Sequence, residues 1–540
     1  MHSNAKRLTR KQAASKMFLP LMLKPLPRKL LFLVLSVFLM APTAFPQVPK
    51  SYLDEVTTTR GSGWVSDQRA LFSSILDPEG LTHPLPQVVL TSSKSDFRLL
   101  SQSSAEPERE QLLNGLRLLL WSKPGSPDVI LKLRINSGAA FDLSGKSGQM
   151  ALLGDLFFPD PATVDYFTDE MGGKLDVSVN YDSITITLVG KASEFERIVD
   201  VLRNAVLTTQ FTPEIITRMR DGRIKLLRDS TISPASVADR AIAARLFGDF
   251  PYGRPAAGFP EDLARVDRAD LMLAHQRFLN SNNATLAIIG GVTKPRTMKT
   301  VRQILGPWRK SEQIVPTTFR QPTPPDAKTL IVNVPGPSVE VRLATRGVSR
   351  SDSEFHAAIV LAKLAQHRWQ AAAPELATQP VFVRSDAYVL PGAFVMGATV
   401  NSQSTADSVA NAKKVLDSLV NTPATAAELE RAKNEVVNEV TVMLAKPENA
   451  PDPFLDMETY RMSAVQDQIA LLRAVNSSDL QRVANRLFKS AAVATVVAGE
   501  TLQLKPALEG RLQYEVLGEI ATPAPTPKSP AKPASNNNPM

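Results

Sequence analysis

The chain has 540 residues, of which 43% are hydrophobic, so it can bury several cores and is not a disordered protein. Its net charge is +9, but residues 1–50 hold nine basic side chains and no acidic one, which leaves 53 basic and 53 acidic residues in the remainder. A neutral body gives no indication of a nucleic-acid partner. The chain has no cysteine, which excludes disulfides, a thiolate nucleophile and a lipid-modified cysteine.

The first 47 residues have the pattern of an export signal. A basic stretch precedes the apolar run at 30–40, and small residues suited to cleavage follow at 41–44. The run is shorter than the roughly 20 residues of a comfortable membrane span. We therefore expect a periplasmic or secreted protein of bacterial type, attached to the membrane only if the signal stays uncleaved. Residues 48–105 are poorly patterned and are predicted to form an N-terminal extension.

Two parts of the chain resemble each other at a constant spacing. A Pro-Gly turn followed by alternating apolar residues begins at Pro124 and again at Pro335, an offset of 211 residues. A helical stretch leading into an apolar run begins at Asp270 and again at Asp479, an offset of 209. This period is longer than that of solenoid repeats, so it indicates a duplicated domain.

The repeat divides the chain into a series of segments. The predicted first domain is 106–312, the proline-rich linker is 313–327, and the second domain is 328–505. Residues 506–540, rich in proline and alanine towards their end, are predicted to form a disordered tail.

Each domain is predicted to open with a pair of strands, to continue with helices and extended pieces, and to close on a buried strand. The opening strands are 116–120 with 129–136, and 329–334 with 339–345; the helices include 213–228, 236–246, 354–369, 406–420 and 426–444; the extended pieces are 174–189 and 392–399; the closing strands are 284–290 and 494–499. This non-alternating order predicts an α+β fold made of two homologous α/β-sandwich halves.

Five stretches, in their order and spacing, resemble the insulinase/pitrilysin (inverzincin) family of zinc metallopeptidases, in its two-domain processing-peptidase branch. They are an opening strand at 113–120, the approach to the zinc helix at 137–148, a Gly-Gly strand at 171–176, a Pro-Tyr-Gly loop at 251–255 and the helix start at 261–263. The resemblance covers about residues 110–505. It implies that the two halves form a clamshell.

The family's chemistry uses an H-x-x-E-H helix, in which two histidines bind zinc and the glutamate acts as base. The resemblance places these three positions on Ala151, Gly154 and Asp155, and the distal carboxylate ligand on Leu226 or Leu227. No two of the five histidines stand at the i,i+3 or i,i+4 spacing of a helical metal site. We therefore predict no catalytic residue, no metal and no cofactor. Asp155 is expected to be a solvated helix residue or the partner of a nearby arginine.

The resemblance also implies a way to hold peptides. Its peptide-binding edge strand falls on Leu175, Asp176, Val177 and Ser178. The arginine and tyrosine with which the family's second domain grips substrate fall on Pro374 and near Val381, with Arg384 or Tyr388 as possible substitutes.

These observations favour a catalytically inactive peptide-binding or regulatory subunit that partners an active zinc metallopeptidase homologue as a heterodimer in proteolysis. Two alternatives stay open. One is a divergent metalloendopeptidase with a non-standard metal site, and the other is an envelope scaffold protein.

Overall fold

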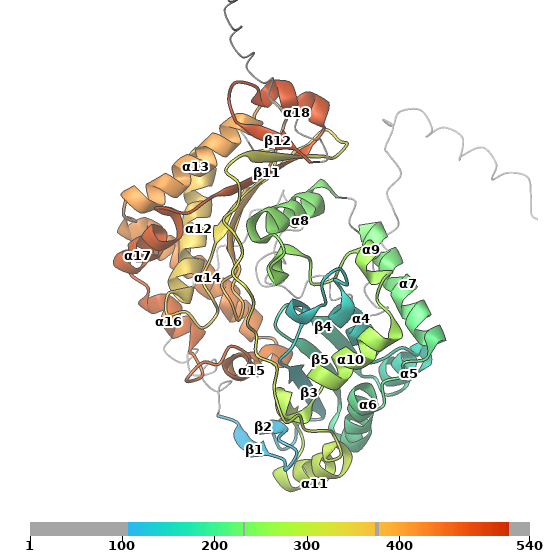
Figure 1. The fold of residues 1–540 in the computed structure, drawn as a ribbon. Helices are drawn as coiled ribbons and strands as arrows, with labels where there is room; N and C mark the ends of the chain where they lie inside the picture. The colour runs from blue at the N-terminus through green and yellow to red at the C-terminus, as the bar shows by residue number, and fades with distance from the viewer. Residues whose placement is uncertain (1–105, 231–232, 373–376, 518–540) are drawn as a thin grey trace, which may run out of the picture. The chain divides into compact units, whose positions relative to one another are not determined.

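The computed structural model describes residues 106–230, 233–372 and 377–517 (Figure 1). The predicted export signal at 1–47, the predicted N-terminal extension at 48–105 and the last part of the predicted tail lie outside the described residues. Within the described ranges, no helix combines the length and the apolar character that crossing a bilayer requires.

The first half contains a six-stranded mixed sheet in the order β1-β2-β6-β3-β5-β4. Its strands are β1 (Glu108–Gln111), β2 (Arg117–Ser122), β3 (Asp128–Ile135), β4 (Lys174–Val179), β5 (Ile184–Lys191) and β6 (Ala284–Gly290). Its helices are α4 (Gln149–Asp155), α5 (Pro161–Asp165), α6 (Phe195–Leu207), α7 (Pro213–Ser230), α8 (Pro234–Phe247), α9 (Pro260–Leu263), α10 (Arg268–Phe278) and α11 (Lys294–Leu305).

The second half contains an equivalent sheet in the order β12-β7-β11-β8-β10-β9. Its strands are β7 (Thr329–Asn333), β8 (Val339–Arg346), β9 (Phe382–Ser385), β10 (Ala393–Val400), β11 (Ala494–Gly499) and β12 (Tyr514–Val516). Its helices are α12 (Phe355–Ala372), α13 (Thr405–Asn421), α14 (Ala426–Leu444), α15 (Asp452–Thr459), α16 (Gln468–Ala474), α17 (Ser477–Phe488) and α18 (Thr501–Leu508). Two sheets with matching strand order confirm the predicted α+β fold with two homologous halves.

The prediction that the opening strands of each half pair with each other is wrong. In the first sheet β6 lies between β2 and β3, parallel to β2 and antiparallel to β3. In the second sheet β11 lies between β7 and β8 in the same way. The physical reason is burial: every residue of β6 and of β11 is buried, and such a strand needs a hydrogen-bonded neighbour on both sides.

The predicted start of the disordered tail at residue 506 is also wrong. Helix α18 continues to Leu508, and β12 adds a parallel strand to β7 at the end of the second sheet. Leu512, Tyr514 and Val516 are partly buried against the second core, so they supply the apolar contacts that fix this last strand. The second half therefore extends to Val516.

Each sheet packs one face against the helices of its own half. In β3, Val129, Leu131 and Leu133 point into the first core, because side chains alternate along a strand. The intervening Lys132 and Arg134 project from the other face, where the residues are also largely buried.

The other face of each sheet is covered by a helix from the opposite half. Helix α8 of the first half packs on β8 and β11, and Asp239 of α8 accepts a hydrogen bond from Nε of Arg342 at 2.8 Å. Helix α15 of the second half packs on the first sheet, and its Asp452 lies 2.6 Å from Nζ of Lys132. Each half thus places one helix on the sheet of the other half, an arrangement called here the helix exchange. An ion pair between the helix and a strand joins each of these contacts.

His356 makes the stability of the second half dependent on pH. This buried α12 side chain forms a hydrogen bond with Gln468 of α16 at 2.9 Å. Burial lowers the pKa of His356 to about 4, and the bond to Gln468 only partly opposes it. In the unfolded chain this histidine has a pKa of about 6.5. Between pH 6.5 and pH 4 the unfolded chain therefore binds a proton at His356 that the folded protein does not bind. The free energy of unfolding falls as the pH drops through this range.

We expect His356→Gln to remove this dependence. Between pH 7 and pH 4 the free energy of unfolding of the natural protein should fall by roughly 3 kcal/mol relative to the variant. Urea unfolding at a series of pH values measures this difference. A difference between the two proteins that stays constant with pH would contradict the assignment.

Candidate functional site

Helix α4 carries the three positions of the expected zinc motif, and a buried carboxylate fixes where it begins. The side chain of Asp142 accepts hydrogen bonds from the backbone N–H groups of Gly148 at 2.7 Å and Met150 at 2.8 Å. These donors have no partner within the helix, so the carboxylate satisfies them. Burial raises the pKa of Asp142 to about 7, against the lowering effect of the two amides and of Arg254. Gly148 has φ +93°, a conformation that favours glycine.

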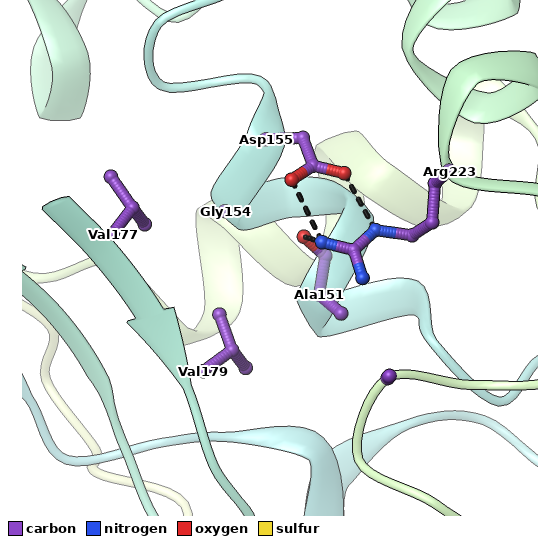
Figure 2. Close-up of a pocket in the computed structure, with 7 residues that line it drawn as sticks. Ala151, Gly154, Asp155, Val177, Val179 and Arg223 are labelled. Atoms are coloured by element: carbon purple, nitrogen blue, oxygen red, sulfur yellow. Dashed lines mark hydrogen bonds and ion pairs between the residues drawn. The ribbon is translucent and has the colours of Figure 1, made fainter. Parts of the chain in front are cut away.

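Ala151, Gly154 and Asp155 line a small hollow on one side of α4 (Figure 2). Val177 and Val179 of β4 stand on its other side. The free space is about 10 Å³, about enough for a single water molecule. The structure therefore brings the three predicted positions together, but it leaves no room for a substrate between them and β4.

A bidentate ion pair fills the charged end of this hollow. Nε of Arg223, from α7, donates to Oδ2 of Asp155 at 2.6 Å, and Nη2 donates to Oδ1 at 2.7 Å and to the carbonyl oxygen of Ala151 at 3.2 Å (Figure 2). The Arg223 side chain is 5% exposed. Asp155 is thus the partner of an arginine, which is one of the two roles expected for it.

The side chains at this place do not fit a zinc ion. Zinc in proteins takes at least three protein ligands, usually including imidazole or thiolate. The motif positions offer a methyl group, no side chain and a carboxylate whose two oxygens already accept from Arg223. At the distal position, Leu227 is 1% exposed and belongs to the apolar core. Across the described ranges, no three histidine, aspartate or glutamate side chains are grouped as metal ligands would be.

The close approach of β4 explains why position 154 has no side chain. A Cβ atom on Gly154 would lie 2.9 Å from Cγ2 of Val179 and 3.5 Å from Cγ1 of Val177. The first distance is shorter than side chains tolerate, and valine is stiff at χ1. The glutamate of the family motif therefore has no space at this position unless β4 moves away.

Sequence reasoning missed Arg223 and Asp142. Arg223 precedes the expected distal position, Leu227, by four residues, so the two share a face of α7. That spacing was the available signal for an arginine facing the motif. Asp142 had no comparable signal, because it lies in a turn six residues before the helix start it caps.

The expected substitutes for the substrate-gripping residues have other partners. Arg384 donates to Asp386 at 3.0 Å and lies 3.9 Å from Asp239. The ring of Tyr388 packs against Tyr181 and Tyr252, with centroid distances of 4.9 and 4.7 Å. Val381 is buried, and Pro374 lies outside the described residues. Both substitutes are thus engaged in contacts within the protein.

The predicted peptide-binding strand lies at the end of the first sheet. Strand β4 pairs with β5, and β5 with β3, so the outer side of β4 has no strand neighbour in the described sheet. Leu175 and Asp176 border a cavity of about 490 Å³ together with Ile130 and Glu448. The surrounding protein raises the pKa of Asp176, against the lowering effect of Lys132. The side chain of Asp176 has no hydrogen-bond or ion-pair partner among the described residues.

Comparison with known proteins agrees with this architecture. Residues 265–436 match the family model described as peptidase M16 inactive domain. An uncharacterized zinc protease of Mycobacterium leprae is 23% identical over 203 residues, which are 37% of this chain and 46% of that protein. Subunit 1 of the human cytochrome b-c1 complex is 22% identical over 232 residues, 42% of this chain and 48% of that one. The chain thus spans about half the length of the curated relatives it matches.

The crystal structure of a peptidase M16 inactive domain from Pseudomonas fluorescens superimposes with a TM-score of 0.65 at 16% identity, over 74% of this chain and 99% of that one. The chain thus has the fold of M16-type peptidase-like proteins, and its residues 265–436 are similar to their inactive domain. The family-model match begins after α4, so the state of the motif in this chain is described by its own sequence and structure.

The contact between Gly154 and β4 predicts an unusual response to alanine. A glycine-to-alanine change inside a helix ordinarily stabilises by about 1 kcal/mol. At Gly154 we expect the clash with Val179 to outweigh this gain, so that Gly154→Ala lowers the free energy of unfolding by about 1 kcal/mol. Gly222→Ala on α7, where a Cβ meets nothing within 4 Å, is the matched control and should stabilise.

Urea unfolding of Gly154→Ala, Gly222→Ala, Val179→Ala and the double variant Gly154→Ala with Val179→Ala measures these effects. In the Val179→Ala background the change at 154 should become stabilising. If Gly154→Ala stabilises the natural protein as much as Gly222→Ala does, β4 does not restrict this position.

The ion pair between Asp155 and Arg223 predicts how variants at these two positions change the free energy of unfolding. Asp155→Ala leaves the buried guanidinium of Arg223 without its counterion, and we expect a loss of about 3 kcal/mol. The double variant Asp155→Ala with Arg223→Met removes both charges, and it should be more stable than Asp155→Ala alone. Urea unfolding of these two variants and of Arg223→Met alone provides the comparison. Additive effects of the two changes would show that the pair is not coupled.

Proposed function

We propose that this M16-type protein is a non-catalytic subunit that binds extended peptides and assists an active zinc metallopeptidase homologue. The observation that carries the proposal is the state of α4: the motif positions provide no imidazole, and both oxygens of Asp155 accept from Arg223. Zinc-dependent hydrolysis needs a metal-bound water and a base, and these residues supply neither. We therefore propose that the protein functions without zinc and without another cofactor.

Peptide binding is supported by the position of β4. An extended peptide can add to an open sheet edge through main-chain hydrogen bonds, while neighbouring side chains select its sequence. Strand β4 lies at such an edge, and its Asp176 borders the cavity of about 490 Å³. A carboxylate without a partner at that place favours peptides with a basic side chain.

The partner is proposed to be a homologue that keeps H-x-x-E-H, joined to this chain as a heterodimer. The family resemblance and the description of the matching family model as an inactive domain support a division of labour between two such chains. The basic and apolar pattern at 1–47 supports a location outside the cytoplasm, periplasmic or secreted.

The test uses the purified mature protein alone and mixed with a homologue that keeps the zinc motif. Alone it should contain no stoichiometric zinc and cleave no peptide, while the mixture should cleave peptides faster than the homologue does. Asp155→Ala should leave the activity of the mixture unchanged wherever the variant is folded. Asp176→Lys should raise KM about tenfold for a basic peptide with little change in kcat, because it reverses the charge beside β4. Glu170→Lys, at an exposed site outside the cavity lining, is the control.

Stoichiometric zinc together with peptide hydrolysis lost in Asp155→Ala would overturn the proposal in favour of the divergent metalloendopeptidase. A mixture no faster than the homologue alone would remove the assisting role.

A scaffold function is the second candidate, because one relative is named as a subunit of the cytochrome b-c1 complex. Affinity purification from the native envelope separates the two. A co-purifying zinc peptidase supports the assisting subunit, and a stable assembly without a peptidase supports the scaffold.

A further inference from the structure

The linker between the two halves covers a second cavity, which lies outside the motif and outside the β4 edge. Its volume is about 890 Å³, within the range of sites that take small molecules or the end of a peptide. The linker contributes 315, 316 and 318–323 to its wall, and the first half contributes the remainder. The aromatic and positively charged side chains that we consider in this lining are Phe250, Arg254, Arg277, Phe278, Phe319 and Arg320.

One part of the wall is aromatic. Phe319 of the linker packs against Phe141 and Phe250 of the first half, with ring centroids 5.9 and 6.1 Å away. Phe141 also packs against Phe278 at 4.8 Å. These rings hold the linker against the first half and present apolar surface to the cavity, which suits an aromatic or long apolar group.

The other part of the wall carries positive charge without matching negative charge. Arg254, Arg277 and Arg320 line the cavity, and none of them forms an ion pair with a carboxylate of the described residues. Arg254 donates to the carbonyl oxygen of Asp142 at 2.7 Å, but its Nε is buried without a hydrogen-bond partner. The guanidinium of Arg277 lies over the ring of Phe278, 5.5 Å from the centroid.

The acidic residues of the lining do not balance these cations. The side-chain oxygens of Asp142 accept from the backbone at the start of α4, so they are turned to the helix. Asp249 is the second acidic side chain of the wall, and it is exposed, as are Arg277 and Arg320, so the wall carries three guanidinium groups against two carboxylates. Three guanidinium groups beside an aromatic surface therefore leave an excess of donors for an anion.

We propose that this cavity binds a carboxylate attached to an apolar group, such as the free C-terminus of a peptide that ends in an aromatic residue. A guanidinium binds a carboxylate through paired, charge-assisted hydrogen bonds, and the phenylalanine rings remove the apolar group from water. The same chemistry is present in a free aromatic acid, so the experiment compares both sources.

The experiment measures binding to the full mature chain by calorimetry with three probes: acetyl-Ala-Ala-Phe with a free carboxylate, the same peptide as its C-terminal amide, and 3-phenylpropionate. The free-acid peptide should bind about tenfold more tightly than the amide, because the amide lacks the charge that the arginines recognise. Tighter binding of the peptide acid than of 3-phenylpropionate assigns the site to peptide ends, and equal binding assigns it to the free acid.

The variants test the two parts of the wall separately. Arg277→Gln with Arg320→Gln should weaken the acids about tenfold or more and leave the amide unchanged. Phe319→Ala should weaken acids and amide alike. Arg309→Gln removes one positive charge near the linker but outside the cavity lining, and it should have no effect. Thermal unfolding checks that each variant is folded.

Three results would overturn the site. They are the absence of binding by either acid, equal binding of acid and amide, and an effect of Arg309→Gln as large as that of the cavity variant.

Discussion

The ion pair between Asp155 and Arg223 determines what α4 can do. Two helices that the family resemblance joins through a metal are joined here through a guanidinium, which bridges the carboxylate of α4 and the carbonyl oxygen of Ala151 from its position on α7. A guanidinium is permanently charged and nearly excluded from solvent here, so it needs these acceptors in place. With both oxygens of Asp155 engaged, the carboxylate has little capacity left for any other cation.

The packing around this pair extends the same constraint to β4. Because Gly154 has no side chain, Val179 comes within contact of the helix backbone, and Val177 and Val179 close the hollow. Their inward direction fixes the register of the strand, which turns Asp176 to the opposite face. The motif positions are therefore packed closely against β4 and joined to α7 by the ion pair. The edge proposed to bind peptides depends on that packing for its orientation.

Much of the fold could be predicted from the sequence, because its signals are local. The alternation of Leu131 and Leu133 identified β3, and the apolar run 284–290 identified β6. The motif positions could be placed because the stretch 137–148, which carries part of the family resemblance, lies directly before α4. The neighbours of these elements were not predictable in the same way. The sequence of residues 284–290 alone does not indicate that this strand lies between β2 and β3. Its position in the sheet depends on pairing with strands about 150 residues earlier in the chain.

The candidate site shows the same limit. The residue types at the motif positions could be read directly from the sequence. The role of Arg223 could not, because it depends on the packing of α7 against α4 in the folded protein. The cavity under the linker had no sequence signal of its own. Its arginines come from the loop after α8, from α10 and from the linker, and each is an ordinary residue within its own segment.

Charged residues on the inner strands explain why the two halves depend on each other. Arg134 of β3 has Asp452 and Asp456 as its carboxylate partners, and both come from α15 of the second half. Arg342 of β8 is 1% exposed, and it pairs with Asp239 of α8 as well as with Glu340 beside it. If the first half were separated, Arg134 would lose both of its carboxylate partners. If the second half were separated, Arg342 would keep only Glu340 of its two partners. These requirements do not depend on the residues at the motif, since a buried charge without its partner costs several kcal/mol. The two halves are therefore joined by ion pairs at both exchanged helices, α8 on the second sheet and α15 on the first.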